Sequence, residues 1–482
     1  MSGYDVIVVG AGMGGLTAAA LLARRGLRVL VVDQHDLPGG SCTSWRRTVG
    51  TGDRALHFEF DSGVHEISGV GEQGAVGWLL RTLGVEDRLR WLRVRHEYFS
   101  GDVHLQAPES ADALLEALCE RFPAERDGLT RLFGQMHALW ASLRAALGGP
   151  VFRRAAAASP PAPEGATRWM HQSYAGLLFA CVRDPELLRL LFMLTSYLSD
   201  EPEHVSAGAM AGVYGYYFEG GYFPDGGLQR LPDALVEAIR RDGGEVRLSC
   251  PVARILVEDG GATGVELESG ERLHSARVVS NADVRRTMLQ LVGPDHLKPE
   301  LLERFRSLEP SPSAFSVYLG LDVQPEMGPV AFVSRQGSPH YGITSMSRVC
   351  PALASPGHAT LELMQLVPAR EAATWDRRAP DYGARSAARA DELIDLAERQ
   401  LPGLRRHIVY RQEATPATFE RYLRTTGGAI YGLSTRSMRP SRRTPIAGLS
   451  LVGAGTFPGS GVEAVVISGM SVAEDLCPER PR

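Results

Sequence analysis

The chain has 482 residues, of which 44% are hydrophobic and 22% charged, and its formal net charge is −5 at pH 7. These values predict a large globular protein of two or three structural units and give no indication of nucleic-acid binding. No apolar stretch reaches the ~18 residues of a transmembrane helix, and a strand-like segment begins at Tyr4, which leaves no room for a signal peptide and favours a cytoplasmic protein.

The six cysteines stand at positions 42, 119, 181, 250, 350 and 477. They form no CxxC pair and no spacing typical of zinc ligands, so we expect reduced thiols and no bound metal. Cys42, which lies near a glycine-rich motif, is expected to be a small packed residue.

The first predicted element is an apolar strand over residues 4–9, followed by a glycine-rich turn and an alanine-rich helix that reaches Ala23. The turn reads Gly10-Ala11-Gly12-Met13-Gly14-Gly15, the Gly-x-Gly-x-x-Gly pattern of dinucleotide-binding proteins. In this pattern Gly10 permits a tight turn, Gly12 lets a pyrophosphate approach the backbone, and Gly15 lets the helix pack closely on the strand. The phosphates then lie at the positive N-terminus of the helix.

A second predicted strand, residues 27–32, ends at Asp33, which is 18 residues after Gly15 (33 − 15). A carboxylate at roughly 20 residues from the turn is placed to bind the 2′-hydroxyl of an adenosine ribose. We expect Asp33 and the adjoining Gln34 to contact this ribose. The strands, turn, helix and acid together predict a Rossmann-like domain, but they do not distinguish NAD from FAD.

Two further glycine-rich segments favour FAD. Pro38-Gly39-Gly40-Ser41 directly follows the ribose acid, where a long dinucleotide needs a second close approach of the backbone. Near the other end of the chain, a strand that ends at Val452 leads into a glycine-rich loop and a helix from about Gly461 to Leu476. The exposed amides of this segment would face the negative edge of a reduced flavin, and we expect contacts from Gly455, Thr456, Gly461 and Val462. An ordinary turn is the alternative.

Between the two ends, helical spacing over residues 109–146 predicts covering helices, and the alanine- and proline-rich stretch 148–163 predicts a mobile loop. A helix is predicted over residues 228–241. Strands are predicted over residues 245–248, 250–257 and 263–267, and a turn at Asp259-Gly260-Gly261 joins the last two into a hairpin.

Six motifs, spread over nearly the whole chain, resemble the phytoene desaturase, carotenoid isomerase and retinol saturase family of flavoproteins. They are Gly10–Gly15, Asp33–Gly40, Phe60–His65, Gly221–Leu228, Val278–Asp283 and Phe457–Val462. The resemblance implies an α/β fold in which a Rossmann-like FAD-binding domain of the glutathione-reductase type carries an inserted, mixed α+β substrate domain. It also implies FAD contacts from Val64, from Asn281, and from the backbone of Val252 beside the adenine.

The same resemblance assigns residues 1–105, 220–285 and 440–482 to a discontinuous FAD-binding domain. The two insertions between these stretches, residues 106–219 and 286–439, then form the substrate-binding domain.

The expected substrate is apolar, because aromatic residues are concentrated between positions 174 and 223. They are Tyr174, Phe179, Phe192, Tyr197, Tyr214, Tyr216, Tyr217, Phe218, Tyr222 and Phe223. Flat π faces suit a long conjugated or isoprenoid chain, which offers little to hydrogen-bond and much area to bury, with core packing as the alternative for each residue. The leucine-rich segment 187–194 is expected either in the core or in peripheral contact with a membrane, where Asp200-Glu201 would prevent deep insertion. The oligomeric state is left open.

The predicted chemistry centres on Val64-His65-Glu66. In the resembling family this segment lies against the isoalloxazine, and the retinol saturase branch is similar to this chain in carrying histidine there. Because flavin chemistry on a carbon–carbon bond couples a hydride with a proton, we expect His65 to move the proton near neutral pH, with a structural histidine as the alternative. Tyr222, through its hydroxyl, and Glu463, at the start of the last helix, are further catalytic candidates, and helix capping is the alternative role of Glu463.

Two other function classes are open. Flavin amine oxidases share the fold resemblance but use a lysine-bound water near the flavin, and the matching segment 312–318 has no lysine. Rab GDP-dissociation inhibitors resemble the fold as non-catalytic binding proteins without flavin, whereas the intact glycine motifs and Asp33 favour a bound cofactor. We therefore expect an FAD-dependent oxidoreductase that desaturates, saturates or isomerises carbon–carbon double bonds of a conjugated polyene or isoprenoid.

Overall fold

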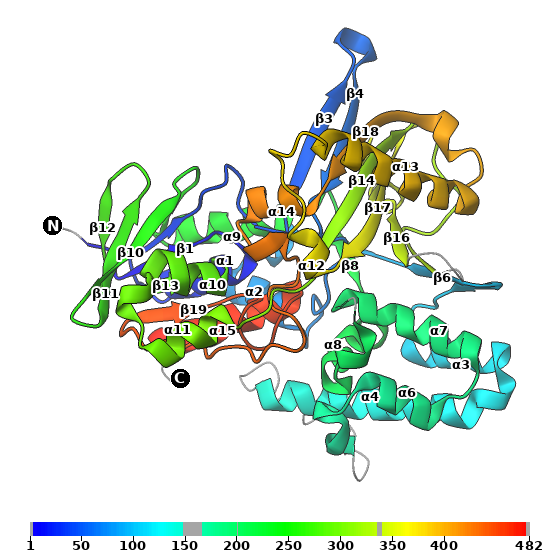
Figure 1. Ribbon diagram of the computed structural model, residues 1–482, viewed down its shortest axis with the longest axis horizontal. Helices are drawn as coiled ribbons and strands as arrows, with labels where there is room; N and C mark the ends of the chain where they lie inside the picture. Colours follow the sequence, from blue (N-terminus) through cyan, green and yellow to red (C-terminus); the bar gives the residue numbers. More distant parts are fainter. Residues whose placement is uncertain (1–2, 148–165, 200, 335–339, 479–482) are drawn as a thin grey trace.

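The computed structural model describes residues 3–147, 166–199, 201–334 and 340–478 and has three parts (Figure 1). Two parts are built on β-sheets of five and seven strands, and the third is a group of helices. The predicted mobile loop over residues 148–163 lies outside the described residues.

The first part is built on a parallel sheet in the order β19-β13-β1-β2-β9. Its strands are β1 (Val6–Val9), β2 (Val29–Val32), β9 (Glu245–Arg247), β13 (Val278–Ser280) and β19 (Leu449–Leu451). Val6 and Val8 pack in one apolar cluster and Ile7 and Val9 in another, so both faces of the sheet are covered. This arrangement confirms the predicted Rossmann-like α/β fold.

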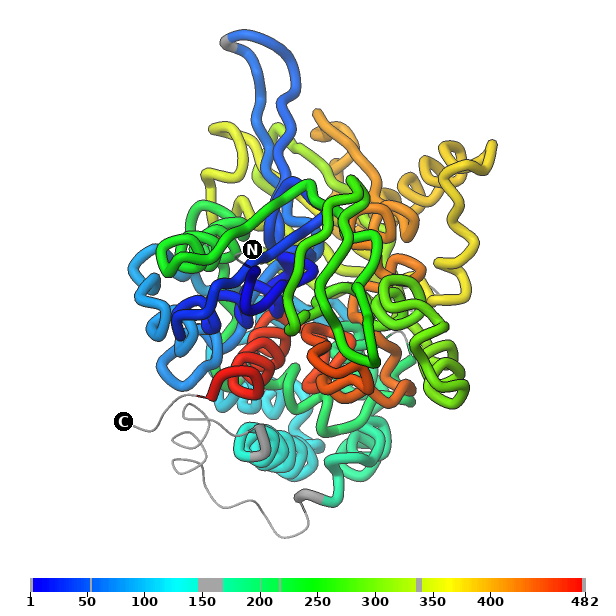
Figure 2. Tube along the Cα trace, turned by 90° about the vertical axis from the view of Figure 1, so that its left-hand side faces the viewer, coloured from blue at the N-terminus to red at the C-terminus, as the bar shows by residue number. Residues whose placement is uncertain are grey.

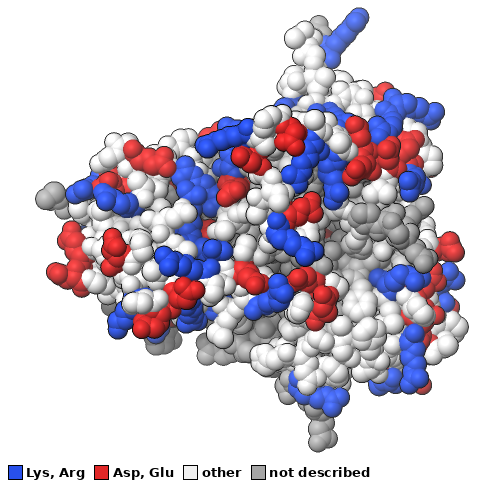
Figure 3. Space-filling view, viewed as in Figure 1, with Lys and Arg blue, Asp and Glu red and all other residues white. Residues whose placement is uncertain are grey.

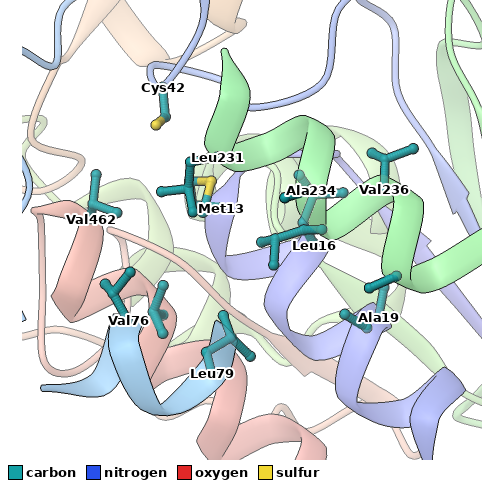
Figure 4. Packing of buried hydrophobic residues seen from close by; sticks show 14 of the residues in the cluster. Met13, Leu16, Ala19, Cys42, Val76, Leu79, Leu231, Ala234, Val236 and Val462 are labelled. Atoms are coloured by element: carbon teal, nitrogen blue, oxygen red, sulfur yellow. The ribbon is translucent and has the colours of Figure 1, made fainter. Parts of the chain in front are cut away.

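Four helices cover one face of this sheet. They are α1 (Met13–Arg24), α2 (Ala75–Leu83), α9 (Arg230–Arg241) and α15 (Val462–Leu476), and α1 contacts each of the other three. Figure 4 shows side chains from all four helices in one cluster, among them Leu16, Leu79, Leu231 and Val462. Burial of these side chains joins segments from the beginning, middle and end of the chain.

The opposite face is covered by a small antiparallel sheet and short helices. The strands are β10 (Val252–Glu258), β11 (Gly261–Leu267) and β12 (Arg272–His274), and the helices are α10 (Val284–Arg286) and α11 (Pro299–Arg306). The predicted hairpin is present, and its turn uses the left-handed residues Asp259 and Gly260, with φ of 47° and 77°.

The second part is a seven-stranded sheet in the order β18-β14-β17-β16-β15-β6-β7. Its strands are β6 (His96–Ser100), β7 (Val103–Gln106), β14 (Ser313–Leu321), β15 (Val330–Ser334), β16 (Tyr341–Thr344), β17 (Ala359–Val367) and β18 (Ile408–Ala414). Helix α13 (Tyr382–Gln400) packs on one face, and α12 (Ala369–Ala372) and α14 (Pro416–Leu423) flank the sheet.

The boundary predicted at residue 105 is wrong. Strand β6 pairs in parallel with β15, more than two hundred residues later, and β7 pairs with β6. Both strands therefore belong to the second sheet and not to the FAD-binding part.

Two hairpin-like pairs connect the parts. Strands β3 (Ser44–Val49) and β4 (Leu56–Asp61) form a hairpin that projects from the molecule (Figures 1 and 2) and whose base packs on β17. Strands β5 (Trp91–Arg93) and β8 (Tyr222–Pro224) pair beside the helices. The base of the first hairpin thus lies where the two large sheets approach each other.

The third part consists of α3 (Ala111–Arg121), α4 (Arg126–Leu147), α6 (Tyr174–Cys181), α7 (Pro185–Phe192) and α8 (Ala207–Phe218). Tyr174 and Tyr214 are fully buried in its core, and their hydroxyl oxygens are 2.9 Å apart. For these two aromatics the alternative of core packing holds, because their rings fill the space between the helices. Among the described helices, none is long and apolar enough to cross a membrane.

Candidate active site

The turn between β1 and α1 has the geometry that a pyrophosphate needs. Gly10 has a φ of +100°, a conformation that favours glycine. A Cβ on Gly15 would lie 2.3 Å from the Gly10 carbonyl oxygen, so only glycine lets α1 begin this close to β1. The first turn of α1 has no side-chain cap at Gly12 and no acidic residue, so its first amides, those of Met13 and Gly14, are left for an anion.

Asp33 lies beside this turn, at the end of β2. Its Oδ2 accepts a hydrogen bond from the Ala11 amide at 2.5 Å, and its Oδ1 accepts one from the His35 amide at 2.7 Å. Burial raises the pKa of Asp33 above its ordinary value, and the two amides act against this rise. Gln34 points elsewhere, because its side-chain amide donates to the Tyr422 carbonyl oxygen at 2.7 Å. The ribose contact predicted for the Gln34 side chain therefore does not fit.

The second glycine-rich segment runs along the first. The Gly39 amide donates to the Ala11 carbonyl oxygen at 2.7 Å, and a Cβ on Gly40 would lie 3.3 Å from the Gly12 Cα. Ser41 follows, half-buried. The two segments form one continuous backbone cradle.

The start of β10 also reaches the ribose acid. The Cys250 amide donates to the Asp33 carbonyl oxygen at 2.7 Å, and Val252, two residues on, is buried. Val252 therefore lies near the end of β2, as its predicted contact with the adenine requires.

The Asn281 side chain lies between the glycine turn before α1 and the loop that begins at Gly453. Its Oδ1 accepts a hydrogen bond from the Gly15 amide at 3.0 Å. A Cβ on Gly12 would lie 2.4 Å from Asn281 Nδ2, and a Cβ on Gly453 would lie 2.8 Å from Asn281 Oδ1. The side chain expected to bind the cofactor thus holds two parts of the cradle together.

The loop before α15 offers backbone groups to a ligand. Thr456 is fully buried, and its hydroxyl donates to the Gly453 carbonyl oxygen at 2.9 Å, so the side chain points inward. A Cβ on Gly455 would lie 2.4 Å from Val284, whereas Gly461 has open space around it and a φ of +99°. Contacts from Gly455 and Thr456 to FAD would therefore be made by the backbone.

Three other predicted cofactor residues have apolar side chains. Those of Met13 and Val462 are buried in the core (Figure 4), and that of Val64 is half-buried. Cys42 lies in the same core, which confirms its predicted packing role.

His65 follows β4 and contacts β17 of the second sheet. Its Nε2 is 3.4 Å from Oε2 of Glu362, and the two side chains are 17% and 6% exposed. Burial lowers the pKa of His65 to about 4, although the charge of Glu66 acts to raise it. The imidazole is therefore neutral at pH 7, which does not fit the expected titration near neutral pH.

Glu362 and Asp61 are buried carboxyl groups next to this histidine. Glu362 on β17 stands opposite Tyr318 on β14, and burial raises its pKa well above the ordinary value, with a further rise from Asp61. Asp61 accepts a hydrogen bond from the Ser44 hydroxyl at 3.0 Å, and its pKa is raised to about 8, mainly by burial. Burial therefore favours the protonated form of both carboxyl groups and the neutral form of the imidazole.

Glu66, the neighbour of His65, joins the three parts of the molecule. Its two carboxylate oxygens are 2.9 and 2.8 Å from Nε2 of His96 on β6, and it accepts a hydrogen bond from the Tyr197 hydroxyl at 2.8 Å. Burial acts to raise the pKa of Glu66, but His96 and Tyr197 outweigh it, so the pKa is lowered. These contacts fix the backbone that carries His65.

Tyr222 lies beside the same segment. Its backbone exchanges hydrogen bonds of 2.8 and 2.9 Å with Ile67, and its ring lies 5.1 Å from the Arg93 guanidinium. Its position near His65 fits the sequence prediction, but the guanidinium covers the ring.

The catalytic role predicted for Glu463 is not supported by its contacts. Its carboxylate accepts hydrogen bonds from the Ser68 hydroxyl at 2.9 Å and from the Ala75 amide at 3.1 Å. Both oxygens are thus used by the protein at the start of α2, and the residue holds α2 against α15.

An aromatic cluster that the sequence analysis missed lies around the buried carboxyl groups. It consists of Trp45, Phe58, Phe60, Tyr318 and Tyr410, from β3, β4, β14 and β18. Phe60 directly precedes Asp61, and Tyr318 stands opposite Glu362. These flat apolar groups flank the polar centre.

The residues present fit FAD. Two glycine-rich segments and Asp33 form a cradle for an adenosine pyrophosphate, and a buried polar centre lies where the second sheet meets this cradle. No group of histidine, cysteine or acidic side chains that could hold a metal ion is found in the described part of the chain. The fold and the site define an FAD-dependent oxidoreductase.

The chain belongs to the flavin-containing amine oxidoreductase family, which matches residues 13–477. It is 27% identical over 507 residues to prolycopene isomerase 1 of an Oncidium hybrid cultivar, with 98% of this chain and 83% of that protein covered. It is 29% identical to a lycopene-forming phytoene desaturase of Pseudescherichia vulneris, with coverage of 98% and 99%. These relatives confirm the resemblance found in the sequence.

Solved structures show the same fold. An oxidoreductase from Methanosarcina mazei matches with a TM-score of 0.69 and 20% identity, covering 97% of this chain and 99% of the other. A putrescine oxidase matches with a TM-score of 0.65 and 20% identity over 98% of both chains. A Rab GDI from Plasmodium falciparum matches with a TM-score of 0.59 and 12% identity over 99% of both chains. At these identities the likeness extends to the fold alone.

Proposed function

We propose that the protein uses FAD to desaturate, saturate or isomerise carbon–carbon double bonds of a conjugated polyene or isoprenoid. The relatives named prolycopene isomerase and phytoene desaturase support this substrate class. Within the molecule, the observation that carries the proposal is the buried His65–Glu362 pair beside the aromatic cluster. The uncharged His65–Glu362 pair could donate or accept a proton next to aromatic surfaces that suit a polyene.

The cradle residues would hold the cofactor. FAD supplies hydride transfer to or from a carbon atom of the substrate. Asp33 would orient the ribose, and the backbone of Gly39, Gly40 and the loop before α15 would approach the phosphates and the flavin edge. His65 and Glu362 would keep an exchangeable proton in a site that is largely buried, with 17% of the His65 side chain exposed.

Amine oxidation is disfavoured by the position of lysine. The chain has a single lysine, Lys298, and it is exposed immediately before α11. Strand β14, which matches the lysine-bearing segment of amine oxidases, carries Ser316 and Tyr318 instead. A binding protein without flavin is disfavoured because the glycine turn and Asp33 keep the geometry of a dinucleotide site.

We further propose that the second sheet and the helical part bind the substrate, and that the enzyme is cytoplasmic with peripheral membrane contact through α6. Phe179 on α6 is 63% exposed, with its ring centroid 5.9 Å from that of Phe192. The middle of the helical part, at lower right in Figure 3, shows few charged side chains. Replacement of Phe179 by serine should reduce sedimentation with lipid vesicles, and unchanged sedimentation would argue against this contact.

The function is tested by anaerobic incubation of the purified, FAD-loaded protein with candidate polyenes while flavin absorbance is followed. Bleaching of the oxidised flavin by a polyene indicates a desaturase. Product that forms only after prior reduction of the flavin indicates a saturase or a redox-assisted isomerase. A colourless, folded protein that binds no added FAD would refute the enzyme and favour the binding protein.

A further inference from the structure

Glu362 is the one charged residue of strand β17. Its neighbours on β17, Leu361 and Leu363, pack in the core beneath α13, so Glu362 points to the other face of the sheet, toward Tyr318 and β4. In the described part of the chain its one ion-pair contact is His65, and no arginine or lysine lies within 4.0 Å. A buried carboxyl group without a cationic side chain is unusual in a purely structural role.

Two polar atoms of this pair lack hydrogen-bond partners. Both His65 Nε2 and Glu362 Oε1 are fully buried atoms without a partner among the described residues. A buried polar atom without a partner costs about 1–3 kcal/mol, so native proteins retain few of them. Glu362 therefore has Oε2 near His65, while its buried Oε1 lies on the side of Ser316 and Tyr318 without a hydrogen bond of good geometry.

The two groups have complementary protonation states. Burial raises the pKa of Glu362 well above its ordinary value and lowers that of His65 to about 4, so burial favours the protonated carboxyl group and the neutral imidazole. The other titratable groups that face Glu362 are Asp61 from β4 and Tyr318 from β14, and neither is cationic. Pairs of groups whose environments separate their pKa values in this way are typical of acid–base sites.

We propose that Glu362, and not His65, carries the proton that is exchanged with the substrate, and that His65 is its positioning partner. This assignment rests on the proposed function. It explains why a histidine that is neutral at physiological pH lies beside a buried carboxyl group.

Saturation of a double bond requires one hydride and one proton. As the π bond breaks, reduced FAD would supply a hydride, with its two electrons, to one carbon, and Glu362 would supply its proton to the adjacent carbon. The resulting carboxylate takes a proton back from solvent. In desaturation each transfer runs in reverse, and the Glu362 carboxylate accepts the proton; isomerisation combines the two directions without net electron transfer.

The test uses FAD-loaded Glu362→Gln, which keeps the shape of the side chain but has no exchangeable acid proton. Glu97→Gln is the matched control, because Glu97 on β6 is equally buried and its Oε1 accepts a hydrogen bond from Gln106 at 3.0 Å, which glutamine can preserve. Infrared spectra at pH 7 should show a protonated carboxyl signal in the wild type and in Glu97→Gln that is smaller in Glu362→Gln by the contribution of one carboxyl group, because Asp61, whose pKa is raised to about 8, keeps its own signal. An unchanged signal would show that Glu362 is ionised and would overturn the proposal.

Turnover provides the second measurement. Glu362→Gln should retain its FAD and lose roughly 10²–10⁴ in turnover, the usual contribution of general acid–base catalysis, while Glu97→Gln stays near the wild type. Polyene turnover that survives in Glu362→Gln refutes the role of Glu362 but leaves the proposed function standing. Wild-type protein that binds FAD but converts no polyene refutes the proposed function and, with it, the assignment of the substrate proton.

Discussion

Replacement of Gly15 by alanine should loosen the FAD cradle. The added Cβ would lie 2.3 Å from the Gly10 carbonyl oxygen and 3.0 Å from the Asn281 Cβ, closer than atoms can approach without a shift of β1 or α1. Overpacking of this kind costs about 1–3 kcal/mol. If the shift also breaks the hydrogen bond from the Gly15 amide to Asn281, a further ~1–3 kcal/mol is lost. Alanine has a helix propensity about 1 kcal/mol more favourable than that of glycine, which offsets part of this cost. The expected net loss in the free energy of unfolding is about 1–5 kcal/mol.

The matched control is Gly134→Ala. Gly134 is exposed inside α4, with no atom within 4 Å of an added Cβ, so alanine should stabilise the helix by about 1 kcal/mol. Fluorescence titration of the apoproteins with FAD should show at least roughly fivefold weaker binding for Gly15→Ala, equivalent to about 1 kcal/mol, and no change for Gly134→Ala. Thermal unfolding should give a lower Tm for the first variant only. Normal FAD affinity together with a Tm at or above the wild-type value for Gly15→Ala would refute the steric argument.

Three further predictions concern single side chains. Asp33→Ala should weaken FAD binding by roughly 1.5–3 kcal/mol in an FAD titration, because it removes a charged hydrogen-bond acceptor for the ribose; unchanged affinity would show that the ribose lies elsewhere. His65→Gln should preserve most turnover, whereas His65→Ala should lower both turnover and stability, because His65 positions Glu362 without carrying the proton. Steady-state kinetics measure this difference. Equally slow turnover in both variants would show that His65 itself carries the proton. Asp61→Asn should raise stability relative to the wild type increasingly from pH 4 to pH 8. The pKa of Asp61 in the folded protein is raised to about 8, against about 3.9 in the unfolded chain. The contribution of Asp61 to the free energy of unfolding is therefore fully present below the unfolded pKa and is lost as pH rises, by up to about 4 kcal/mol at pH 7. A stability difference between the variant and the wild type that does not change with pH in thermal unfolding would contradict this.

The FAD cradle could be predicted from the sequence because its signals are local. The glycines of the first turn, the apolar strands and Asp33 lie within one β-α-β segment, where each residue type is required by the backbone conformation or by the ligand. The structure places the Gly39-Gly40 segment and Asp33 where this pattern requires them. Gln34 differs because its side chain meets Tyr422, a contact with no local signal.

Features that depend on distant pairing were missed. The membership of β6 and β7 in the second sheet depends on the parallel pairing of β6 with β15, which no local pattern encodes. The role of Glu362 was missed for the same reason, since its partner His65 is nearly three hundred residues away. One signal was available, because Glu362 is the one charged residue of strand β17. For Tyr174 and Tyr214 the sequence left two alternatives open, since aromatic composition alone does not distinguish a binding surface from a core, and the structure places both in the core.

The order of strands in the parallel sheet has a consequence for synthesis in the cell. The edge strand β19 is made 440 residues after β1 ends (449 − 9), and α15, which packs on α1, follows it. At about 5–20 residues per second, the ribosome needs roughly 20–90 s to produce this interval. During that time the apolar faces of β1 and α1 lack their final partners and are available to chaperones. The FAD contacts expected from the loop before α15 can form only after this last segment has been made, and bound FAD would then stabilise the folded chain.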